Sequence, residues 1–321
     1  MATGIDTRFA AKLLRAGEIV AIPTETVYGL AGNALNDDAV IKIFEAKQRP
    51  KFNPLIVHFA HVALLQKYIA DIPEKAALLA GTFWPGPLTL LLPKKPAISD
   101  LVTGGSSRVA VRIPSHPLAL ELLSQLDFPL AAPSANRFGS ISPTTAAHVE
   151  SQLGRRVSYI LDGGPSTVGV ESTIVGFEGE DPIIYRLGGI GLEEIEECVG
   201  EVTMLTKSDK PQTSGMMKSH YAPGTPLYLG EPAVLLKELT SPKVGVLSFS
   251  KSYTAVEPAY QVVLSESGDL HEAAKNLFSA MHYLDSLGLD VIVAERVPDT
   301  GIGKAINDRL ERARQENKVG E

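Results

Sequence analysis

The amino-acid sequence predicts an α/β protein with a twisted mixed-sheet domain followed by a smaller, Rossmann-like α/β domain. The chain has 321 residues, too many for one ordinary hydrophobic core. Short apolar segments alternate with segments of helical periodicity, the order typical of α/β folds. A polar stretch rich in proline and glycine, residues 206–226, interrupts this alternation before it begins again. We therefore expect a first domain over 1–205, a linker over 206–226 and a second domain over 227–321.

The first domain is expected to begin with a helix capped by Asp6 or Thr7 and closed by Gly17. Further helices are predicted at 37–46, 61–70, 73–83, 116–126, 143–153 and 192–199, and strands at 19–23, 54–59, 88–92, 108–113, 129–133, 158–161, 171–177 and 182–187. The first two strands and the helix between them have the order of a βαβ unit. Residues 102–107 are predicted to form a loop. Arg108 and Arg112 alternate with apolar residues, which places both on one face of a half-buried strand.

The second domain repeats the α/β order on a smaller scale. We predict strands at 227–229, 244–248, 261–264 and 291–295, and helices at 232–239, 270–286 and 302–316. The sequence G-I-G-K-A at 301–305 is similar to a phosphate-binding loop but lacks the full spacing of that motif. We interpret it as the start of a helix.

Composition and charge limit the possible functions. With 44% hydrophobic and 21% charged residues, the chain is expected to be globular, and its net charge of −7 opposes a broad nucleic-acid surface but leaves room for a local basic groove. A single cysteine, Cys198, excludes an internal disulfide and a multi-cysteine metal site. The N-terminal residues lack the apolar core of a signal peptide, and no stretch reaches membrane-spanning length. We expect a cytoplasmic protein without a membrane partner.

Three cations, Lys47, Arg49 and Lys51, surround Pro50 where a predicted helix gives way to a strand. Loops at such junctions often hold ligands, and arginine and lysine at this spacing suit a polyphosphate. The alternative is a solvated helix end, because cations also favour helix C-termini.

Several separated motifs resemble one family. They are P-T-E-T-V-Y-G-L at 23–30, K-Q-R-P-K-F-N-P-L at 47–55, A-P-S-A-N at 132–136, S-H-Y-A-P at 219–223 and, more weakly, the C-terminal G-I-G-K-A-I-N-D-R-L-E-R-A. Together they resemble the YrdC-like family of threonylcarbamoyl-adenylate synthases, whose KxR and SxN pairs match residues 47 to 49 and 134 to 136. The resemblance covers nearly the whole chain and implies the long form of the family, with its YrdC-like mixed-sheet domain and an accessory domain.

The resemblance implies a nucleotidyltransferase that joins L-threonine, bicarbonate and ATP into threonylcarbamoyl-AMP and pyrophosphate. It also implies that a threonylcarbamoyl transferase complex uses the product to modify tRNA next to the anticodon. A carbamate oxygen would attack the α-phosphorus of ATP, a reaction that needs alignment and charge stabilisation more than a strong base. Mg²⁺ is expected with the ATP, held mainly by phosphate oxygens and water, so no residue is predicted as a metal ligand.

The candidate ATP contacts combine the resemblance with local residue types. They are Lys47, Arg49, Asn53, Ser134, Asn136, Ser142, Arg186 and Tyr221. The first two are also the catalytic candidates, because cations there would stabilise charge on the leaving pyrophosphate. Asn53 has the alternative role of a turn former. Ser142 is expected to cap the following helix and present backbone N–H groups to phosphate, although capping alone would explain it.

The candidate threonine contacts are Thr26, His58, Arg112, Ala132 through its backbone, and Ser172. Arg112 would pair with the amino-acid carboxylate, with a surface arginine on an edge strand as the alternative. His58 ends an apolar strand, where a histidine is often structural. A pocket rich in hydroxyl groups selects threonine over valine by hydrogen bonding.

The linker carries apolar side chains that would be unfavourable in water, which predicts that residues 214–223 pack as a lid over the first domain's site. Tyr221 would then lie near ATP with His220 beside it. The alternative is a linker that only docks at the domain interface.

Two other functions compete with this prediction. In the first, an RNA-binding module would use a concave surface formed by Lys47, Arg49, Lys51, Arg155 and Arg156. In the second, the chain would be a carbamoyl transferase similar to the YrdC-like portion of hydrogenase maturation proteins. Those proteins carry cysteine-rich zinc fingers, which a chain with one cysteine cannot form.

Overall fold

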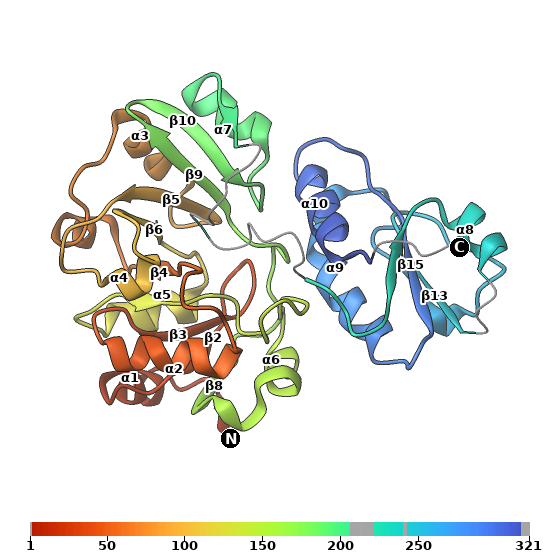
Figure 1. Ribbon diagram of the computed structural model, residues 1–321, viewed down its shortest axis with the longest axis horizontal. Helices are drawn as coiled ribbons and strands as arrows, with labels where there is room; N and C mark the ends of the chain where they lie inside the picture. The colour runs from red at the N-terminus through yellow and green to blue at the C-terminus, as the bar shows by residue number, and fades with distance from the viewer. Residues whose placement is uncertain (1, 206–212, 214–220, 240–242, 316–321) are drawn as a thin grey trace.

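The computed structural model describes residues 2–205, 213, 221–239 and 243–315. Two lobes lie side by side, each built on its own sheet (Figure 1). The larger lobe contains the chain up to residue 205, and the smaller lobe contains the residues from 227 onward. Within the described residues, no helix is both long and apolar enough to span a membrane.

The larger lobe is organised around a mixed sheet, as the sequence predicted. Across this sheet the order is β1 (Ala2–Gly4), β8 (Tyr159–Leu161), β2 (Val20–Ile22), β3 (Gly29–Asn33), β7 (Leu130–Ala131), β4 (Ile56–His58), β6 (Arg108–Arg112), β5 (Leu88–Pro93), β9 (Thr173–Glu178), β10 (Asp181–Arg186) and β11 (Thr203–Met204). The predicted βαβ unit is wrong. The chain turns back after β2, so that β3 pairs antiparallel with it, and β3 and β7 lie between β2 and β4.

The helices of the larger lobe are α1 (Thr7–Arg15), α2 (Asp37–Lys47), α3 (Glu74–Phe83), α4 (Asp100–Thr103), α5 (Pro117–Ser124), α6 (Ala146–Leu153) and α7 (Leu192–Val199). The Asp6 carboxylate caps α1 as predicted, accepting hydrogen bonds from two backbone N–H groups. The predicted helix at 61–70 is a 3₁₀ helix, η1 (Val62–Lys67), in which only Leu65 is buried. The short helix α4 includes the first two residues of the loop predicted at 102–107, and β1, β3 and β11 were not predicted.

The helix expected at 143–153 is α6, which begins at Ala146 and is capped by Thr145. The prediction that Ser142 caps this helix is therefore wrong. Pro143 follows Ser142 and disfavours a helical conformation at Ser142. The Ser142 side chain is buried and points to another partner, described below.

The smaller lobe has a four-stranded parallel sheet in the order β12 (Leu227–Leu229), β15 (Val291–Ala294), β13 (Val244–Ser248) and β14 (Gln261–Val263). Its helices are α8 (Pro232–Glu238), α9 (Leu270–Asp285) and α10 (Gly303–Ala313). The parallel sheet with helices on both sides confirms the predicted Rossmann-like architecture, and G-I-G-K-A does start a helix. Helices α9 and α10 lie on the side that faces the larger lobe (Figure 1).

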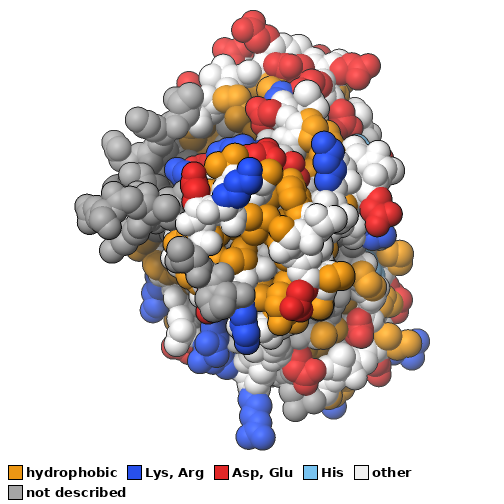
Figure 2. Space-filling view, turned by 90° about the vertical axis from the view of Figure 1, so that its right-hand side faces the viewer, with side chains coloured by type: hydrophobic (Ala, Val, Ile, Leu, Met, Phe, Trp, Pro, Cys, Tyr) orange, Lys and Arg blue, Asp and Glu red, His pale blue; other side chains and the backbone are white. Residues whose placement is uncertain are grey.

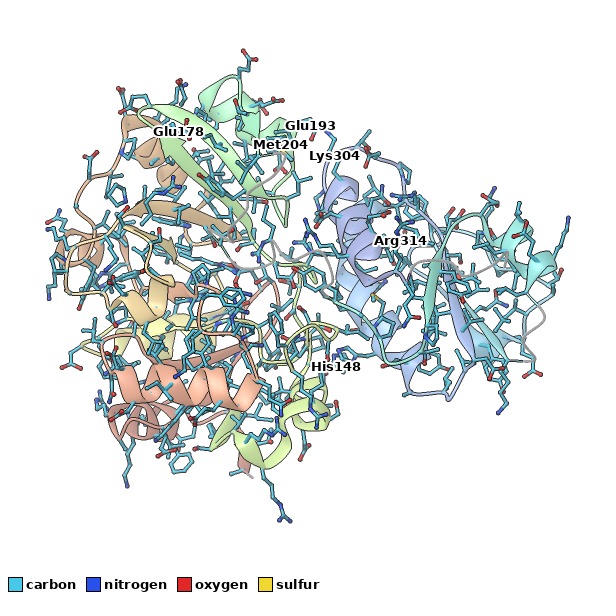
Figure 3. All side chains as sticks on the ribbon, viewed as in Figure 1. His148, Glu178, Glu193, Met204, Lys304 and Arg314 are labelled. Carbon is cyan, nitrogen blue, oxygen red and sulfur yellow. The ribbon has the colours of Figure 1, made fainter. Side chains whose placement is uncertain are left out.

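The two lobes share one hydrophobic cluster. Val27, Ile141 and Val170 of the larger lobe pack with residues of the smaller lobe that include Leu277 and Phe278 of α9. Polar contacts extend this interface at both ends. Lys304 of α10 reaches Glu193 of α7 at 2.5 Å (Figure 3), and the rings of His148 and His282 stack with centroids 4.0 Å apart. Contacts of this kind hold the lobes in one arrangement.

Candidate active site

A small, partly open cavity lies in the larger lobe, next to the interface with the smaller one. Its volume is about 40 Å³. The lining residues are Thr24, Thr26, Val27, Gly29, Arg49, Ile56, His58, Arg112, Ala132, Pro133, Ser134, Glu171, Ser172, Arg186 and Tyr221. They come from the loop after β2, from the ends of the central strands and from Tyr221 between the lobes. Of the predicted site residues, Lys47, Asn53, Asn136 and Ser142 are buried behind this lining.

Main-chain hydrogen bonds bring two distant motifs together at the cavity. The Leu30 N–H donates to the Pro133 carbonyl oxygen at 2.7 Å, and the Ala135 N–H donates to the Tyr28 carbonyl oxygen at 2.7 Å. The loop before them is held by the Thr24 hydroxyl, which donates to the Val27 carbonyl oxygen at 2.6 Å. The hydroxyl-rich loop and the SxN loop therefore form one wall of the cavity.

The two cations of the KxR motif point in different directions. Helix α2 ends at Lys47 because Gln48 adopts a left-handed conformation with φ of 53°. The Lys47 ammonium then donates to the carbonyl oxygens of Ser134 at 2.5 Å and Asn136 at 2.6 Å, and to Asn136 Oδ1 at 3.2 Å. Burial, with the nearby charge of Arg49, lowers the pKa of Lys47. In this arrangement Lys47 anchors the SxN loop from behind.

Arg49 reaches the cavity and is fixed by the turn that follows it. Its Nη2 donates to Asn53 Oδ1 at 2.6 Å and to the Pro54 carbonyl oxygen at 2.9 Å. The Asn53 amide oxygen is thereby occupied, whereas its buried Nδ2 has no hydrogen-bond partner among the described residues. A buried donor of this kind is unfavourable unless a ligand or water accepts from it, so Asn53 combines a turn role with a free donor near the arginine.

Arg112 is buried and already has anionic and hydroxyl partners. Its Nη2 donates to Glu25 Oε1 at 2.6 Å, its Nη1 to Thr26 Oγ1 at 2.9 Å and its Nε to the Gly86 carbonyl oxygen at 3.2 Å. The edge-strand surface alternative is therefore wrong, because β6 lies between β4 and β5. Glu25, which the sequence analysis did not select, lies inside the P-T-E-T motif and offsets the charge of this arginine.

His58 ends β4 with 4% of its surface exposed. Burial, reinforced by the charge of Arg112, lowers the pKa of His58 to about 3, so the imidazole is neutral at pH 7. Its Nδ1 has no hydrogen-bond partner among the described residues. A neutral ring with an available nitrogen can bind a polar ligand but carries no proton to donate as an acid at neutral pH.

Ser172 and Arg186 form the opposite wall. Arg186 Nη2 donates to the Ser172 carbonyl oxygen at 2.9 Å and to its Oγ at 3.1 Å, and the Ser172 hydroxyl also pairs with Thr89 Oγ1 at 2.7 Å. Gly188 lies directly against this segment, where an added Cβ would come within 2.3 Å of the Glu171 carbonyl oxygen. Only glycine permits that approach.

Glu171 was also missed from the sequence, although it directly precedes Ser172. Its Oε1 accepts a hydrogen bond from Ser142 Oγ at 2.6 Å, which explains why Ser142 is buried without capping a helix. Its Oε2 accepts from Arg309 Nε of α10 at 2.8 Å. A carboxylate next to predicted ligand-binding hydroxyl groups was the available signal, but its partner is 138 residues away in the sequence.

Tyr221 is the described part of the predicted lid. It is 1% exposed, has a φ of 68°, and packs 5.6 Å from the Phe278 ring. A positive φ is uncommon for a bulky residue and indicates that the surrounding contacts hold it there. His220 and most of the segment 206–226 lie outside the described residues.

The cavity combines arginine side chains, hydroxyl groups, a carboxylate and a neutral imidazole. Such a set suits a small, anionic, hydroxyl-bearing ligand and charge stabilisation without an acid–base triad. Fold and pocket together place the chain among α/β proteins that bind charged small molecules at strand ends.

Comparisons with known proteins extend this assignment. Residues 12–188 match the Sua5/YciO/YrdC family model, described as telomere recombination, and residues 190–314 match the model for the C-terminal domain of threonylcarbamoyl-AMP synthase. The chain is 44% identical to the threonylcarbamoyl-AMP synthase of Bacillus subtilis, over 95% of this chain and 91% of the relative. It is also 44% identical to that of Pyrococcus abyssi, over 95% and 93%.

Solved structures agree. The crystal structure of P. abyssi Sua5 complexed with L-threonine matches with a TM-score of 0.89 and 40% identity, covering 97% of this chain and 96% of that chain. E. coli YciO, with a TM-score of 0.50 and 20% identity, shares the fold of the larger lobe. The chain belongs to the threonylcarbamoyl-AMP synthase family, in the form with a C-terminal domain.

Proposed function

We propose that the protein is an L-threonylcarbamoyladenylate synthase, a nucleotidyltransferase that makes threonylcarbamoyl-AMP and pyrophosphate from L-threonine, bicarbonate and ATP. One observation carries the proposal. In a chain so closely related to such synthases, a single cavity is lined by every predicted threonine contact and by four predicted ATP contacts: Thr26, His58, Arg112, Ala132 and Ser172, with Arg49, Ser134, Arg186 and Tyr221.

On the threonine side, Arg112 binds the amino-acid carboxylate. Its hydrogen bonds to Thr26 and Glu25 use one N–H of each Nη atom, and a guanidinium carries two on each, so a bidentate fork is still available to a ligand. The neutral His58 ring and the hydroxyl groups of Thr26 and Ser172 surround the polar groups of threonine. This set discriminates against valine, because valine would leave the buried polar groups without partners.

On the ATP side, Arg49 and Arg186 bind phosphate oxygens, and Asn53 Nδ2 is a further donor. Pockets for small-molecule ligands commonly measure about 300–1,000 Å³, and the cavity beside Tyr221 measures about 40 Å³. We therefore propose that Tyr221 moves when ATP binds. Among the described residues there is no group of three or more histidine, cysteine, aspartate or glutamate side chains that could hold a metal ion. The Mg²⁺ that accompanies ATP is then held mainly by phosphate oxygens and water.

The chemistry follows from these contacts. An oxygen of N-carboxythreonine attacks the α-phosphorus and the bond to the pyrophosphate breaks, with the arginines stabilising the charge that gathers on the leaving oxygens. Lys47 contributes by fixing the SxN loop. Residues 1–205 supply this catalysis, 206–226 are the linker, and 227–321 form the accessory domain. The product passes to a threonylcarbamoyl transferase complex that modifies tRNA next to the anticodon.

The test is a pyrophosphate-release assay with ATP and Mg²⁺. Release should require L-threonine and bicarbonate together, and valine should not replace threonine. Mass spectrometry should identify threonylcarbamoyl-AMP as the second product. Release that proceeds equally with carbamoyl phosphate in place of both substrates would support the carbamoyl transferase instead.

The RNA-binding alternative has little structural support. Lys47 and Arg49 are 1% and 6% exposed, so they cannot belong to an open basic surface. On the face shown in Figure 2, lysine and arginine side chains are interspersed with aspartate and glutamate. RNA affinity that falls steeply with salt, without pyrophosphate release, would reverse this conclusion.

A further inference from the structure

The cavity wall contains a carboxylate that the proposed ATP site does not need. Glu171 lines the same cavity as Arg49 and Arg186 and is 6% exposed. Burial by itself would raise its pKa, but the charges of Arg309 and Arg186, with hydrogen bonds from Ser142 and Arg309, outweigh burial and lower the pKa to about 2. The group is therefore ionised at neutral pH. An anion at this position repels a triphosphate unless a cation offsets it.

The offsetting cation comes from the other lobe. Arg309 of α10 is fully buried, and each of its guanidinium nitrogens has a partner across 2.8 Å: Nε pairs with Glu171 Oε2, Nη1 with Asp308 Oδ2, and Nη2 donates to the Leu187 carbonyl oxygen. Its guanidinium carbon also lies 5.2 Å from the centroid of the Tyr221 ring. A fully buried arginine is unfavourable unless its charge is paired, so the partners of Arg309 are what allow an arginine at this position.

The contacts of Arg309 are adjacent in sequence to two proposed ligand-binding residues. Glu171 directly precedes Ser172, and Leu187 directly follows Arg186. Hydrogen bonds from Arg186 to Ser172 join these two ligand-binding residues. Arg309 thus contacts both segments of the wall that faces the smaller lobe. The G-I-G-K-A-I-N-D-R-L-E-R-A stretch contains Arg309, which gives this C-terminal motif a role at the cavity.

We propose that Arg309 is a positioning residue of the nucleotide site: by pairing with Glu171 it removes an uncompensated negative charge from the wall that receives the triphosphate. This inference rests on the proposed function, because it requires that ATP binds in the cavity. The accessory domain then completes the ATP site through α10 without touching substrate.

The test compares three variants by calorimetric ATP binding and by KM. Arg309→Met removes the ion pair of Glu171 and leaves its carboxylate the hydrogen bond from Ser142. It should weaken ATP binding and raise the KM for ATP at least about tenfold, as expected when one partner of a buried charge pair is lost. The KM for threonine should change less than about threefold, because Arg112 and His58 are not involved. The double variant Arg309→Met with Glu171→Gln should return ATP affinity to within about threefold of the wild type, because neutral replacement of a buried pair is tolerated.

Arg312→Met is the matched control, because Arg312 lies on the same helix and pairs with Asp308 rather than with Glu171. It should leave ATP binding unchanged. Equal losses of ATP and threonine affinity in Arg309→Met, or a double variant that folds but binds ATP as weakly as the single one, would overturn the proposal. If Arg309→Met does not fold, the ATP affinities of the double variant and of Glu171→Gln alone decide whether the proposal holds. Pyrophosphate release by the wild type tests the function separately, so the two ideas can fail independently.

Discussion

Lys47 illustrates how surroundings decide the role of a single residue. A lysine at the end of an exposed helix would be solvated, and a lysine in an open pocket would bind phosphate. Here the ammonium is 1% exposed and lies within hydrogen-bond distance of three oxygens of the SxN loop. Asn136 Oδ1 also accepts from Ser134 Oγ, so removing the ammonium would leave the carbonyl oxygens of Ser134 and Asn136 without this donor. The KxR motif therefore contains one cation that faces the cavity and one that supports it.

At this scale we predict that Lys47→Met lowers the free energy of unfolding by at least about 3 kcal/mol, because it leaves buried acceptors unsatisfied. Lys42→Met is the control on the same helix: Lys42 is 40% exposed and pairs with Glu18, so its loss should amount to about 0–1 kcal/mol. Urea denaturation of both variants measures the difference. Equal, small effects would show that the Lys47 hydrogen bonds contribute little.

Helices α6 and α9 meet across the lobes through a pair of histidines. His148 and His282 stack at 4.0 Å, and His282 Nε2 lies 3.2 Å from the Ser142 carbonyl oxygen. Burial lowers the pKa of His148 to about 4, and the neighbouring His282 adds to this effect. Burial also lowers the pKa of His282. Both rings are therefore neutral in the folded protein at pH 7.

This pair predicts how stability depends on pH. An unfolded histidine takes up a proton near pH 6.5, whereas His148 in the folded protein does so only near pH 4. The contribution of His148 to the free energy of unfolding is therefore complete above about pH 6.5 and is lost as the pH falls towards 4. Between pH 7 and pH 5 the wild type should lose about 1 kcal/mol more unfolding free energy than His148→Gln, because solvent reaches the half-buried ring and screens part of the effect.

Urea denaturation at the two pH values measures this difference. His271→Gln is the control, because His271 is exposed on the same helix as His282. Between pH 7 and pH 5, His271→Gln should lose as much unfolding free energy as the wild type. A His148→Gln variant with the wild-type pH dependence would show that the stack does not hold His148 neutral.

At the scale of the whole molecule, the two lobes are joined by a shared core. Val27, Ile141 and Val170 pack with Phe278 and its neighbours, and Tyr221 lies in the same cluster. The buried Arg309–Glu171 pair crosses the same boundary. Interfaces between domains are often polar and allow movement, but a large apolar one couples the domains. The cavity lies against this boundary, so its shape depends on both lobes.

We therefore expect one cooperative unfolding transition. Trp84, the only tryptophan, reports on the larger lobe by fluorescence, and far-UV circular dichroism reports on the helices of both lobes. The two signals should change at the same urea concentration, and Phe278→Ala should lower both midpoints together, with a loss of about 3–5 kcal/mol. Val234→Ala is the control, because Val234 is 51% exposed on α8. Separate midpoints for the two signals would show that the lobes unfold independently.

Local patterns were sufficient for much of the fold. Asp6 and Asn36 cap the helices that begin beside them, and short apolar segments located most strands. The sheet order could not be found in this way, since pairing of β2 with β3 and of β3 with β7 depends on contacts between distant segments. Ser142 shows the same limit: a serine before a helix resembles a cap, but its partner is Glu171.

The sequence by itself determined the α/β class, the separation into two units and the residue types of the site, because helix caps, periodicity and motif spacing act over a few neighbouring residues. Only the tertiary structure decided which of these residues face the cavity. It turned Lys47 inward to the SxN loop, paired Arg112 with Glu25, and brought Arg309 against Glu171 from 138 residues away. The physical reason is that a buried charge must be paired, and its partner is set by packing in space rather than by distance along the chain.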